Sequence, residues 1–335
     1  MRLGIDIFSI RLQKWSAIQY LEYCRQLGVD VVHFSEPGMF ESLEESYLRE
    51  VKARADELGL GLEVGMGSIC PTSTSFKPDK GGTAHEQASR MLRVAQTVGS
   101  PIVRCFLGNG NDRLTPAPLE THVASTVETC KAVRSLALDL GVKLAIENHA
   151  GDLQGWELKE LIERAGPDYV GACIGSGNPL WVAEDPMVTL EHLAPYVVSS
   201  HVRDTRVWPH PQGAAALWCS MGDGNVGIQA WTAEFKRRCP NVPYTLEIIT
   251  GMTPRILAYM EDGYWRAFPR ARAAEFARFE RLVRQGQPFL GSMILLGALP
   301  GAPPEYGAAR KAQQLFDIER SVKHCRDILK IGRKP

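Results

Sequence analysis

The sequence lacks an excess of either charge and lacks any long apolar segment. Lys plus Arg and Asp plus Glu each number 38 among the 335 residues, and no run of basic residues occurs. Proteins that bind nucleic acids or anionic membranes present a positively charged surface, which this composition does not predict. No stretch of about 18 apolar residues is present, so no segment is a candidate to span a membrane. We therefore expect a soluble protein that acts on a small, neutral or weakly charged substrate.

The sequence also lacks the features of a secreted, disulfide-bonded protein. The stretch MRLGIDIFSI has neither a long apolar core nor a small-residue cleavage site. The eight cysteines form no CxxC pair and show no zinc-like spacing, so they are predicted to be reduced thiols of a cytoplasmic protein. Cys105 and Cys173 fall on predicted strands, where the expected role of a cysteine is that of a small buried hydrophobic residue.

Strand and helix patterns alternate eight times in the first 285 residues. The predicted strands are residues 3–8, 29–34, 61–69, 101–107, 142–147, 170–174, 197–202 and 244–249. The predicted helices are residues 15–27, 43–58, 84–98, 119–140, 156–165, 186–193, 228–238 and 267–284. Because each parallel strand pair needs a crossover, this alternation predicts a parallel sheet, and eight units predict an α/β fold closed as a (β/α)8 barrel. An open doubly wound sheet is the alternative, although no GxGxxG motif follows the first strand.

Residues 286–335 lie outside this eightfold repeat. They contain the Gly/Pro-rich stretch GALPGAPPEYG, followed by a predicted helix with periodic apolar residues over about 308–329. The apolar side chains of this segment are expected to be buried against another apolar surface. We therefore divide the chain into a barrel, residues 1–285, and a C-terminal extension, residues 286–335, that packs on the barrel or on a neighbouring subunit of a homo-oligomer.

Polar side chains follow most of the predicted strands. The segment KLAIENHAG, residues 143–151, is a strand that ends on a carboxylate, an amide and an imidazole. The polar residues near strand ends are His33, Glu36, Arg104, Glu147, His149, Asn178, His201, Asp204 and Glu247. Parallel α/β folds place their chemistry at the carboxyl ends of the strands, so most of these side chains are expected at one mouth. Glu147, His201 and Glu247 form a ligand set that suits a divalent metal ion.

Five short motifs resemble the xylose-isomerase-like barrel family of sugar and sugar-phosphate isomerases and epimerases. In chain order they are IENHAG (146–151), GSGN (175–178), SHVRDT (200–205), GDGNVG (222–227) and TLEIIT (245–250). The resemblance covers roughly residues 1 to 250, and its specificity comes from the order of motifs that are individually weak. It implies a TIM barrel and a divalent metal, manganese foremost, with magnesium, cobalt or zinc as alternatives.

The family holds its metal with a Glu, an Asp, a His and a Glu, of which this chain matches Glu147, His201 and Glu247. At the position of the Asp it has Gly175, which offers no side-chain ligand. Four interpretations stay open: water completes the coordination, Asp204 substitutes, metal binding is weakened or lost, or the glycine is engineered. The resemblance also implies that the two glutamates act as acid and base around an enediolate.

The remaining residues receive predicted roles with an alternative for each. His149 is a candidate catalytic residue, or it only bonds its loop. Substrate-binding roles are predicted for Asn178, Arg206, Asp204, His33 and Arg104. Asp204 could instead orient His201 or cap the following loop, and Arg206 could be a surface residue. The aromatic side chains Trp181, Trp208, Trp218 and Tyr264 offer flat surfaces on which sugars stack, although core packing is their default role.

The sequence thus predicts a metal-dependent isomerase or epimerase of a sugar or sugar derivative. The same proton abstraction next to a carbonyl also serves a lyase that eliminates from an oxidised (3-oxo) glycoside. A DNA-repair endonuclease of the same barrel family is disfavoured by the neutral charge. A barrel that binds sugars without turnover is a further alternative because of Gly175.

Overall fold

Eight parallel strands form the central sheet of the computed structural model, which describes residues 1–288, 295, 297 and 300–332. The strands follow the order β10-β1-β2-β3-β4-β5-β6-β7, and a parallel bridge between Val202 and Leu246 brings the two edges together. Their bounds are β1 Leu3–Asp6, β2 Val31–Phe34, β3 Gly61–Ser68, β4 Ile102–Phe106, β5 Lys143–Glu147, β6 Val170–Gly175, β7 Val197–His201 and β10 Tyr244–Leu246. The predicted (β/α)8 barrel is therefore confirmed.

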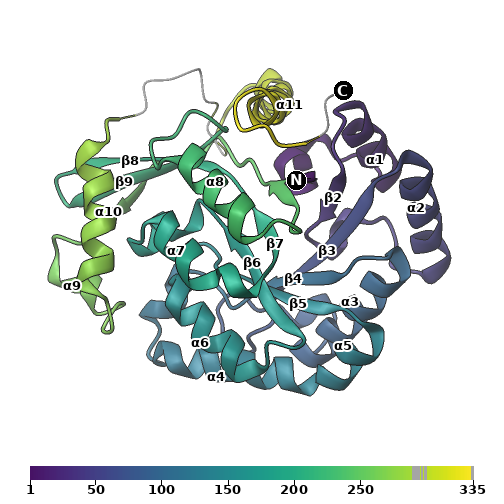
Figure 1. Cartoon of the computed structure of the whole chain (residues 1–335), viewed down its shortest axis with the longest axis horizontal. Coiled ribbons are helices and arrows are strands. Elements are labelled where there is room, and N and C mark those ends of the chain that lie inside the picture. Colours follow the sequence, from purple (N-terminus) through teal and green to yellow (C-terminus); the bar gives the residue numbers. More distant parts are fainter. Residues whose placement is uncertain (289–294, 296, 298–299, 333–335) are drawn as a thin grey trace.

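Helices cover the outside of this barrel (Figure 1). Those that connect its strands are α1 Ala17–Gln26, α2 Glu45–Leu58, α3 Ala84–Val98, α4 Leu119–Ala132, α5 Arg134–Leu140, α6 Gly155–Ala165, α7 Pro186–Leu193 and α8 Ile228–Arg238. Local signals fix their ends: Ser16 and Gln19 form a capping box at α1, and Thr83 and Glu86 form one at α3. The single helix predicted over 119–140 is interrupted at Val133, which gives α4 and α5.

Short 3₁₀ helices lie in the connections, several of them at the carboxyl ends of the strands. Their bounds are η1 Ile7–Gln13, η2 Pro37–Met39, η3 Pro78–Lys80, η4 Gly110–Leu114, η5 Asn178–Val182 and η6 Ala194–Tyr196. Nearly every strand residue is buried, because helices pack on the outer face of the sheet while side chains fill its interior. Within the described residues, no helix is long and apolar enough to cross a membrane.

A second, antiparallel sheet of three strands extends from the mouth of the barrel after β7, and the sequence patterns did not predict it. It consists of β8 Asp204–His210, β9 Gly213–Cys219 and β11 Arg255–Leu257, in the order β11-β9-β8. The helices α9 Asp262–Trp265 and α10 Ala273–Gln285 follow it, and α10 packs against β8 (Figure 1). Phe279 and Val283 of α10 are buried in the apolar cluster between that helix and this sheet.

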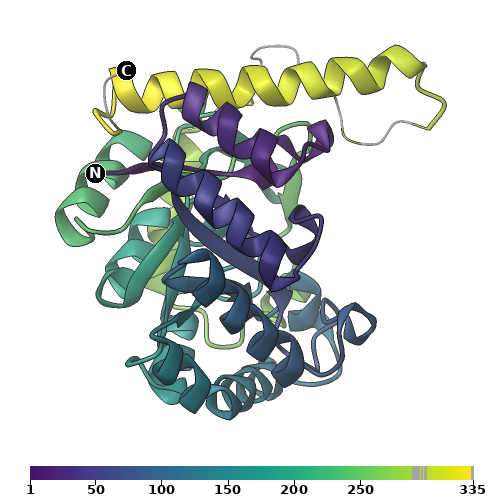
Figure 2. The same ribbon diagram turned by 90° about the vertical axis from the view of Figure 1, so that its right-hand side faces the viewer.

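The last helix, α11 Pro304–Asp327, takes the outer position that residues 267–284 were expected to fill. It packs against η1 and β10, and it runs alongside α1 across the molecule (Figure 2). Gln314 accepts a hydrogen bond from the backbone N–H of Leu12 at 3.0 Å, and Arg326 donates to the carbonyl of Gly28 at 2.7 Å. Ile318 is fully buried, whereas Phe316 is 58% exposed.

Candidate active site

The three predicted metal ligands lie close together inside the mouth of the barrel. His201, the last residue of β7, places its Nδ1 atom 3.1 Å from Oε2 of Glu147 and 3.3 Å from Oε2 of Glu247. Glu147 ends β5, and Glu247 directly follows β10. All three side chains are buried. The parallel strands thus deliver two carboxylates to one imidazole, as the strand-end positions predicted.

The other ring nitrogen of His201 contacts His33. The Nε2 atom of His201 lies 3.0 Å from Nδ1 of His33, which in turn lies 3.5 Å from Glu63. Burial, followed by the nearby charge of His201, lowers the pKa of His33 well below its usual value, so its imidazole is neutral. Ser199 donates to Glu63 at 2.6 Å. His33 is absent from the cavity lining and lies beside His201, where it is placed to orient that imidazole.

Each glutamate carries an arginine partner. Arg104 donates from Nε to Glu147 at 2.6 Å, and Arg203 forms an ion pair with Glu247. Burial alone would raise the pKa of Glu147, but the charges of Arg104 and His201 outweigh it and hold that pKa well below its usual value. Burial lowers the pKa of Arg203 to about 10, so its guanidinium remains charged at neutral pH. Glu147 is therefore a charged base in this geometry.

Asn178 completes the surroundings of Glu147. Its side-chain amide donates to Oε1 of Glu147 at 2.8 Å, while its own Oδ1 atom is buried without a hydrogen-bond partner among the described residues. The neighbouring Gly175 is fixed by Asn148, which accepts from its N–H at 2.7 Å and donates to its carbonyl at 3.0 Å. The GSGN motif thus brings an amide, not a carboxylate, to the glutamate.

A cavity of about 390 Å³ opens above these groups. The predicted residues that line it are Glu36, Arg104, His149, Asn178, Trp181, Trp218 and Glu247. Trp181 and Trp218 stack on each other with ring centroids 4.1 Å apart. A second cavity of about 460 Å³ shares Glu36 and Phe106 with the first. The site therefore has room for more than one small ring.

His149 forms part of the cavity wall and also bonds its loop. Its ring stacks on Phe106 at a centroid distance of 3.8 Å, and its Nδ1 atom lies 2.8 Å from the carbonyl oxygen of Gly108. Burial lowers the pKa of His149 to about 4, so the imidazole is neutral at neutral pH. His149 thus reaches the cavity, as a catalytic role requires, and it also bonds its loop, which was the alternative role.

Like His33, two further predicted substrate-binding residues lie outside the cavity. The carboxylate of Asp204 accepts from the backbone N–H groups of Thr205, Gly222 and Gly224 at 2.8 to 3.1 Å, and so it caps the GDGNVG loop. Arg206 donates to the carbonyl of Asp223 in the same loop. Because both side chains hold this loop, the structure does not bring them to the predicted metal ligands.

Sequence reasoning missed several groups of this site. Arg203 was read only as part of a motif, yet its guanidinium pairs with Glu247 and lies 4.1 Å from the ring centroid of Trp218. Asp6, at the end of β1, places Oδ2 3.6 Å from Nε2 of His201. Both could have been found, because Arg203 follows the predicted strand 197–202 and Asp6 lies near the end of the first one.

The donor set fits a divalent cation. Nδ1 of His201 is buried and, among the described residues, faces only two carboxylate oxygens as possible partners. When Nε2 carries the proton shared with His33, Nδ1 presents a lone pair to those oxygens, and a cation stabilises such an arrangement. Their spacing of 3.1 and 3.3 Å approaches the ~3.0 Å between adjacent ligands of an octahedral ion bound at ~2.1 Å.

Two groups of described residues bring ligand atoms within 4.8 Å of one another, and both include His201. One adds Glu147 and Cys173, and the other adds Asp6 and Glu247. The predicted trio of Glu147, His201 and Glu247 is thus divided between the two groups. These groups support a divalent metal at the floor of the cavity without specifying which ion it is.

The sequence signature described as xylose isomerase-like TIM barrel matches residues 21–265, which is more than half of the chain. The chain belongs to this family. A comparison of this xylose isomerase-like barrel with curated protein sequences gave no match.

Solved structures with the same fold include sugar epimerases. D-psicose 3-epimerase in the presence of D-fructose is 15% identical with a TM-score of 0.62, and the match covers 98% of this chain and 99% of that one. 3-Keto-D-glucoside 4-epimerase from E. coli is 16% identical with a TM-score of 0.57, covering 80% and 98%. A xylose isomerase-like TIM barrel protein from Mycobacterium smegmatis in complex with magnesium is 14% identical with a TM-score of 0.56, covering 84% and 96%. At these identities the likeness shows the fold.

Proposed function

We propose that this barrel is an isomerase or epimerase of a sugar or sugar derivative, and that it moves a proton next to a carbonyl group. The observation that carries the proposal is the pair of buried carboxylates, Glu147 and Glu247, that lie 3.1 and 3.3 Å from Nδ1 of His201, with Glu247 in the wall of the cavity. Membership of a family whose structural neighbours include sugar epimerases supports the same reaction class.

Glu147 and Glu247 are the proposed base and acid. A carboxylate can remove the proton from the hydroxyl-bearing carbon next to a carbonyl, which produces an enediolate. Return of a proton to the other face of that carbon produces the epimer. Return to the neighbouring carbon produces an aldose and ketose pair. Glu147 is the proposed base, because Arg104 and His201 keep its carboxylate in the charged form that can accept a proton.

A divalent ion held by Glu147, His201 and Glu247 would stabilise negative charge that develops on the substrate oxygens. Arg203 supports the same charge from the protein side, since its Nε and Nη1 atoms are buried without a hydrogen-bond partner among the described residues. Oδ1 of Asn178 is likewise available to a substrate hydroxyl. Asn178, Arg203 and Glu247 line the cavity, so they would bind and orient the reacting end of the substrate.

The test is exchange of a substrate proton with solvent. Candidate ketoses and aldoses are incubated with the protein and a divalent metal salt in deuterated water, and deuterium uptake and product are followed by NMR. We expect Glu147→Gln and Glu247→Gln to lower turnover by about 10²-fold or more, because each removes a proton-transfer group. Glu184→Gln is the matched control, since Glu184 is equally buried but bonds Gly155 and Thr189 and not the groups around His201. Full activity of Glu147→Gln and Glu247→Gln would contradict the proposal. Binding of sugar without turnover by the wild type would favour a sugar-binding barrel.

A lyase acting on a 3-oxo glycoside is the second candidate, and the adjoining cavity of about 460 Å³ favours it. The two cavities share Glu36 and Phe106, so a glycoside could place its oxidised ring above Glu147 and its aglycone beyond Phe106. The same proton abstraction would then expel the aglycone. Release of aglycone from 3-oxo-glycosides, lost in Glu147→Gln, would select the lyase over the isomerase.

A further inference from the structure

Cys173 is a buried thiol that faces the same space as the predicted metal ligands. In the register of β5 and β6 it is the direct partner of Glu147, and in the register of β6 and β7 Gly175 is the partner of His201. Residues 173 and 175 lie two positions apart on one strand, so their side-chain positions share the interior face. Cys173 therefore lies next to the position at which a ligand is absent.

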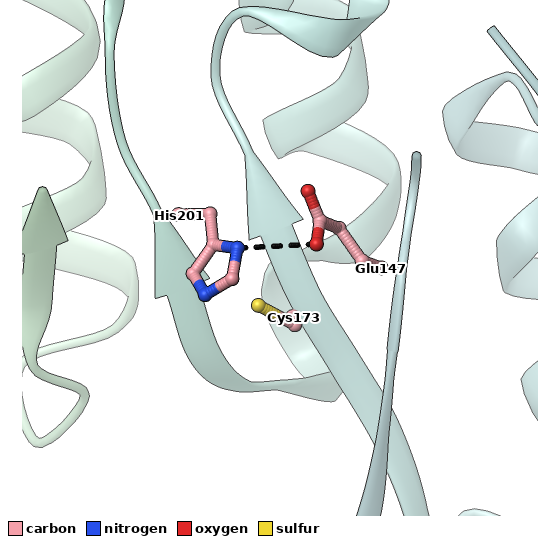
Figure 3. Close-up of side chains that lie close together, drawn as sticks. All are labelled: Glu147, Cys173 and His201. Carbon is pink, nitrogen blue, oxygen red and sulfur yellow. Dashed lines mark ion pairs between the residues drawn. The ribbon is translucent and has the colours of Figure 1, made fainter. Parts of the chain in front are cut away.

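The atoms of this cluster are close enough for one ion. Ligand atoms of Glu147, Cys173 and His201 all lie within 4.8 Å of one another (Figure 3). Adjacent sulfur and nitrogen ligands of a tetrahedral zinc ion are separated by about 3.6 Å, given bonds of about 2.3 and 2.1 Å. A shift of about 1 Å, within the reach of a side-chain adjustment, would therefore complete the site. Nε2 of His201 is engaged with His33, so Nδ1, which faces the carboxylates of Glu147 and Glu247, is the atom that remains for a metal.

We propose that the thiolate of Cys173 is a metal ligand in this chain and takes the place of the carboxylate that Gly175 cannot provide. Glu147 and His201 are the other two protein ligands of the ion, and Glu247, which belongs to the other group of ligand atoms, is then not one of them. The thiol gives up its proton on binding, so a divalent ion is balanced by one thiolate, one carboxylate and one neutral imidazole. The inference rests on the proposed metal site but not on the proposed reaction.

The identity of the metal follows from the sulfur ligand. Thiolates favour zinc and cobalt, whereas all-oxygen sites suit magnesium and manganese. The expected order of affinity is therefore zinc and cobalt above manganese and magnesium, which replaces manganese as the first expectation. Three protein ligands leave a fourth position open, as in catalytic zinc sites, and this position would face the cavity.

The test uses cobalt alone as the probe. The full-length protein is dialysed against a chelator under reducing, oxygen-free conditions, and Co²⁺ is then added to one equivalent. We expect one ion per chain and the near-ultraviolet charge-transfer absorption of a cobalt–thiolate bond. Cys173→Ser should lose that absorption and bind Co²⁺ more than about tenfold more weakly. Cys105→Ser, a fully buried cysteine on the adjacent strand β4, should keep both.

The wild-type spectrum alone decides the inference even if Cys173→Ser does not fold. Binding of one Co²⁺ without the charge-transfer absorption, an absorption that survives in Cys173→Ser, or no binding at all would overturn it. Turnover is measured separately with cobalt and with manganese. Thiolate absorption without turnover of any carbohydrate would leave the inference standing and remove the proposed function, whereas turnover with manganese and no thiolate absorption would do the reverse.

Discussion

The side-chain amide of Asn178 fills the space that a side chain on Gly175 would need. A Cβ atom built on Gly175 would lie 2.7 Å from Nδ2 of Asn178 and 3.4 Å from Oε1 of Glu147. The backbone of Gly175 does not lie in the left-handed region, so the limit on a larger residue is space and not conformation. A carboxylate at this position would therefore displace the amide and point at Glu147.

Gly175→Asp is expected to bind Mn²⁺ at least about tenfold more tightly than the wild type, which corresponds to about 1.4 kcal/mol. The added carboxylate is an oxygen ligand of the kind that Mn²⁺ prefers. Without metal the variant should be less stable, because two carboxylates then face each other. Gly175→Asn is the control of equal size and no charge. Titration calorimetry that finds equal Mn²⁺ affinity in the Asp and Asn variants would contradict the expectation.

Arg104→Met is expected to lower the free energy of unfolding by about 3–5 kcal/mol, because it leaves the buried carboxylate of Glu147 without its main partner. Adding Glu147→Gln should recover part of that loss. The exposed pair of Arg49 and Glu45 gives the comparison, and Arg49→Met should cost less than about 1 kcal/mol. Urea unfolding of the four proteins measures these differences. An equal loss of unfolding free energy in Arg104→Met and Arg49→Met would mean that Arg104 and Glu147 do not form this ion pair in solution.

The stability of the protein is expected to fall as pH rises from about 4.5 to about 8 because of Glu184. Burial raises the pKa of Glu184 to about 8, and its carboxyl accepts from the N–H of Gly155 at 3.0 Å. The folded state then holds a proton that the unfolded state has lost, so the stabilisation is complete below the unfolded pKa and disappears through the folded one. The slope is at most about 1.4 kcal/mol per pH unit. Glu184→Gln should flatten the profile measured by urea unfolding between these pH values, and an unchanged profile would contradict the assignment.

Ile318→Ala is expected to cost about 2–5 kcal/mol, because Ile318 anchors α11 in the core and its truncation leaves a cavity. Phe316→Ala, on the exposed side of the same helix, should change stability by less than about 0.5 kcal/mol. Thermal and urea unfolding distinguish the two. Similar small effects at both positions would show that α11 contributes little to the barrel in solution.

The barrel could be predicted from the sequence because its signals are local. The strand predicted over 61–69 is observed as Gly61–Ser68, and the helix predicted over 84–98 is Ala84–Val98. The antiparallel sheet could not be predicted from the sequence, because its strands give weak signals. β8 contains Pro209, and β9 contains the run Ala214 to Ala216. These strands exist through pairing with each other and with β11. The choice of α11 over α10 beside β10 is likewise a long-range packing outcome.

The candidate site divides in the same way. Glu147, His201 and Glu247 were predicted because polar groups at the ends of parallel strands must meet. This rule alone would bring Asp204 to the mouth, but β7 ends at His201 and the chain turns at once into β8, so Asp204 caps the 222–224 loop, which was the alternative role predicted for it. The position of Cys173 beside Glu147 depends on strand register, which composition and spacing do not contain.

The pairing of β1 with β10 joins Leu3 to Tyr244, and α11 packs against β10 and against η1, which follows β1. On a ribosome that adds about 5–20 residues per second, roughly 10 to 50 s pass between the synthesis of these two partners. During that interval the first strand has one unpaired edge, and an unpaired edge is a template for association with other chains. Cover of this edge, by a chaperone or by the chain's own early helices, would limit such association until β10 has been synthesised.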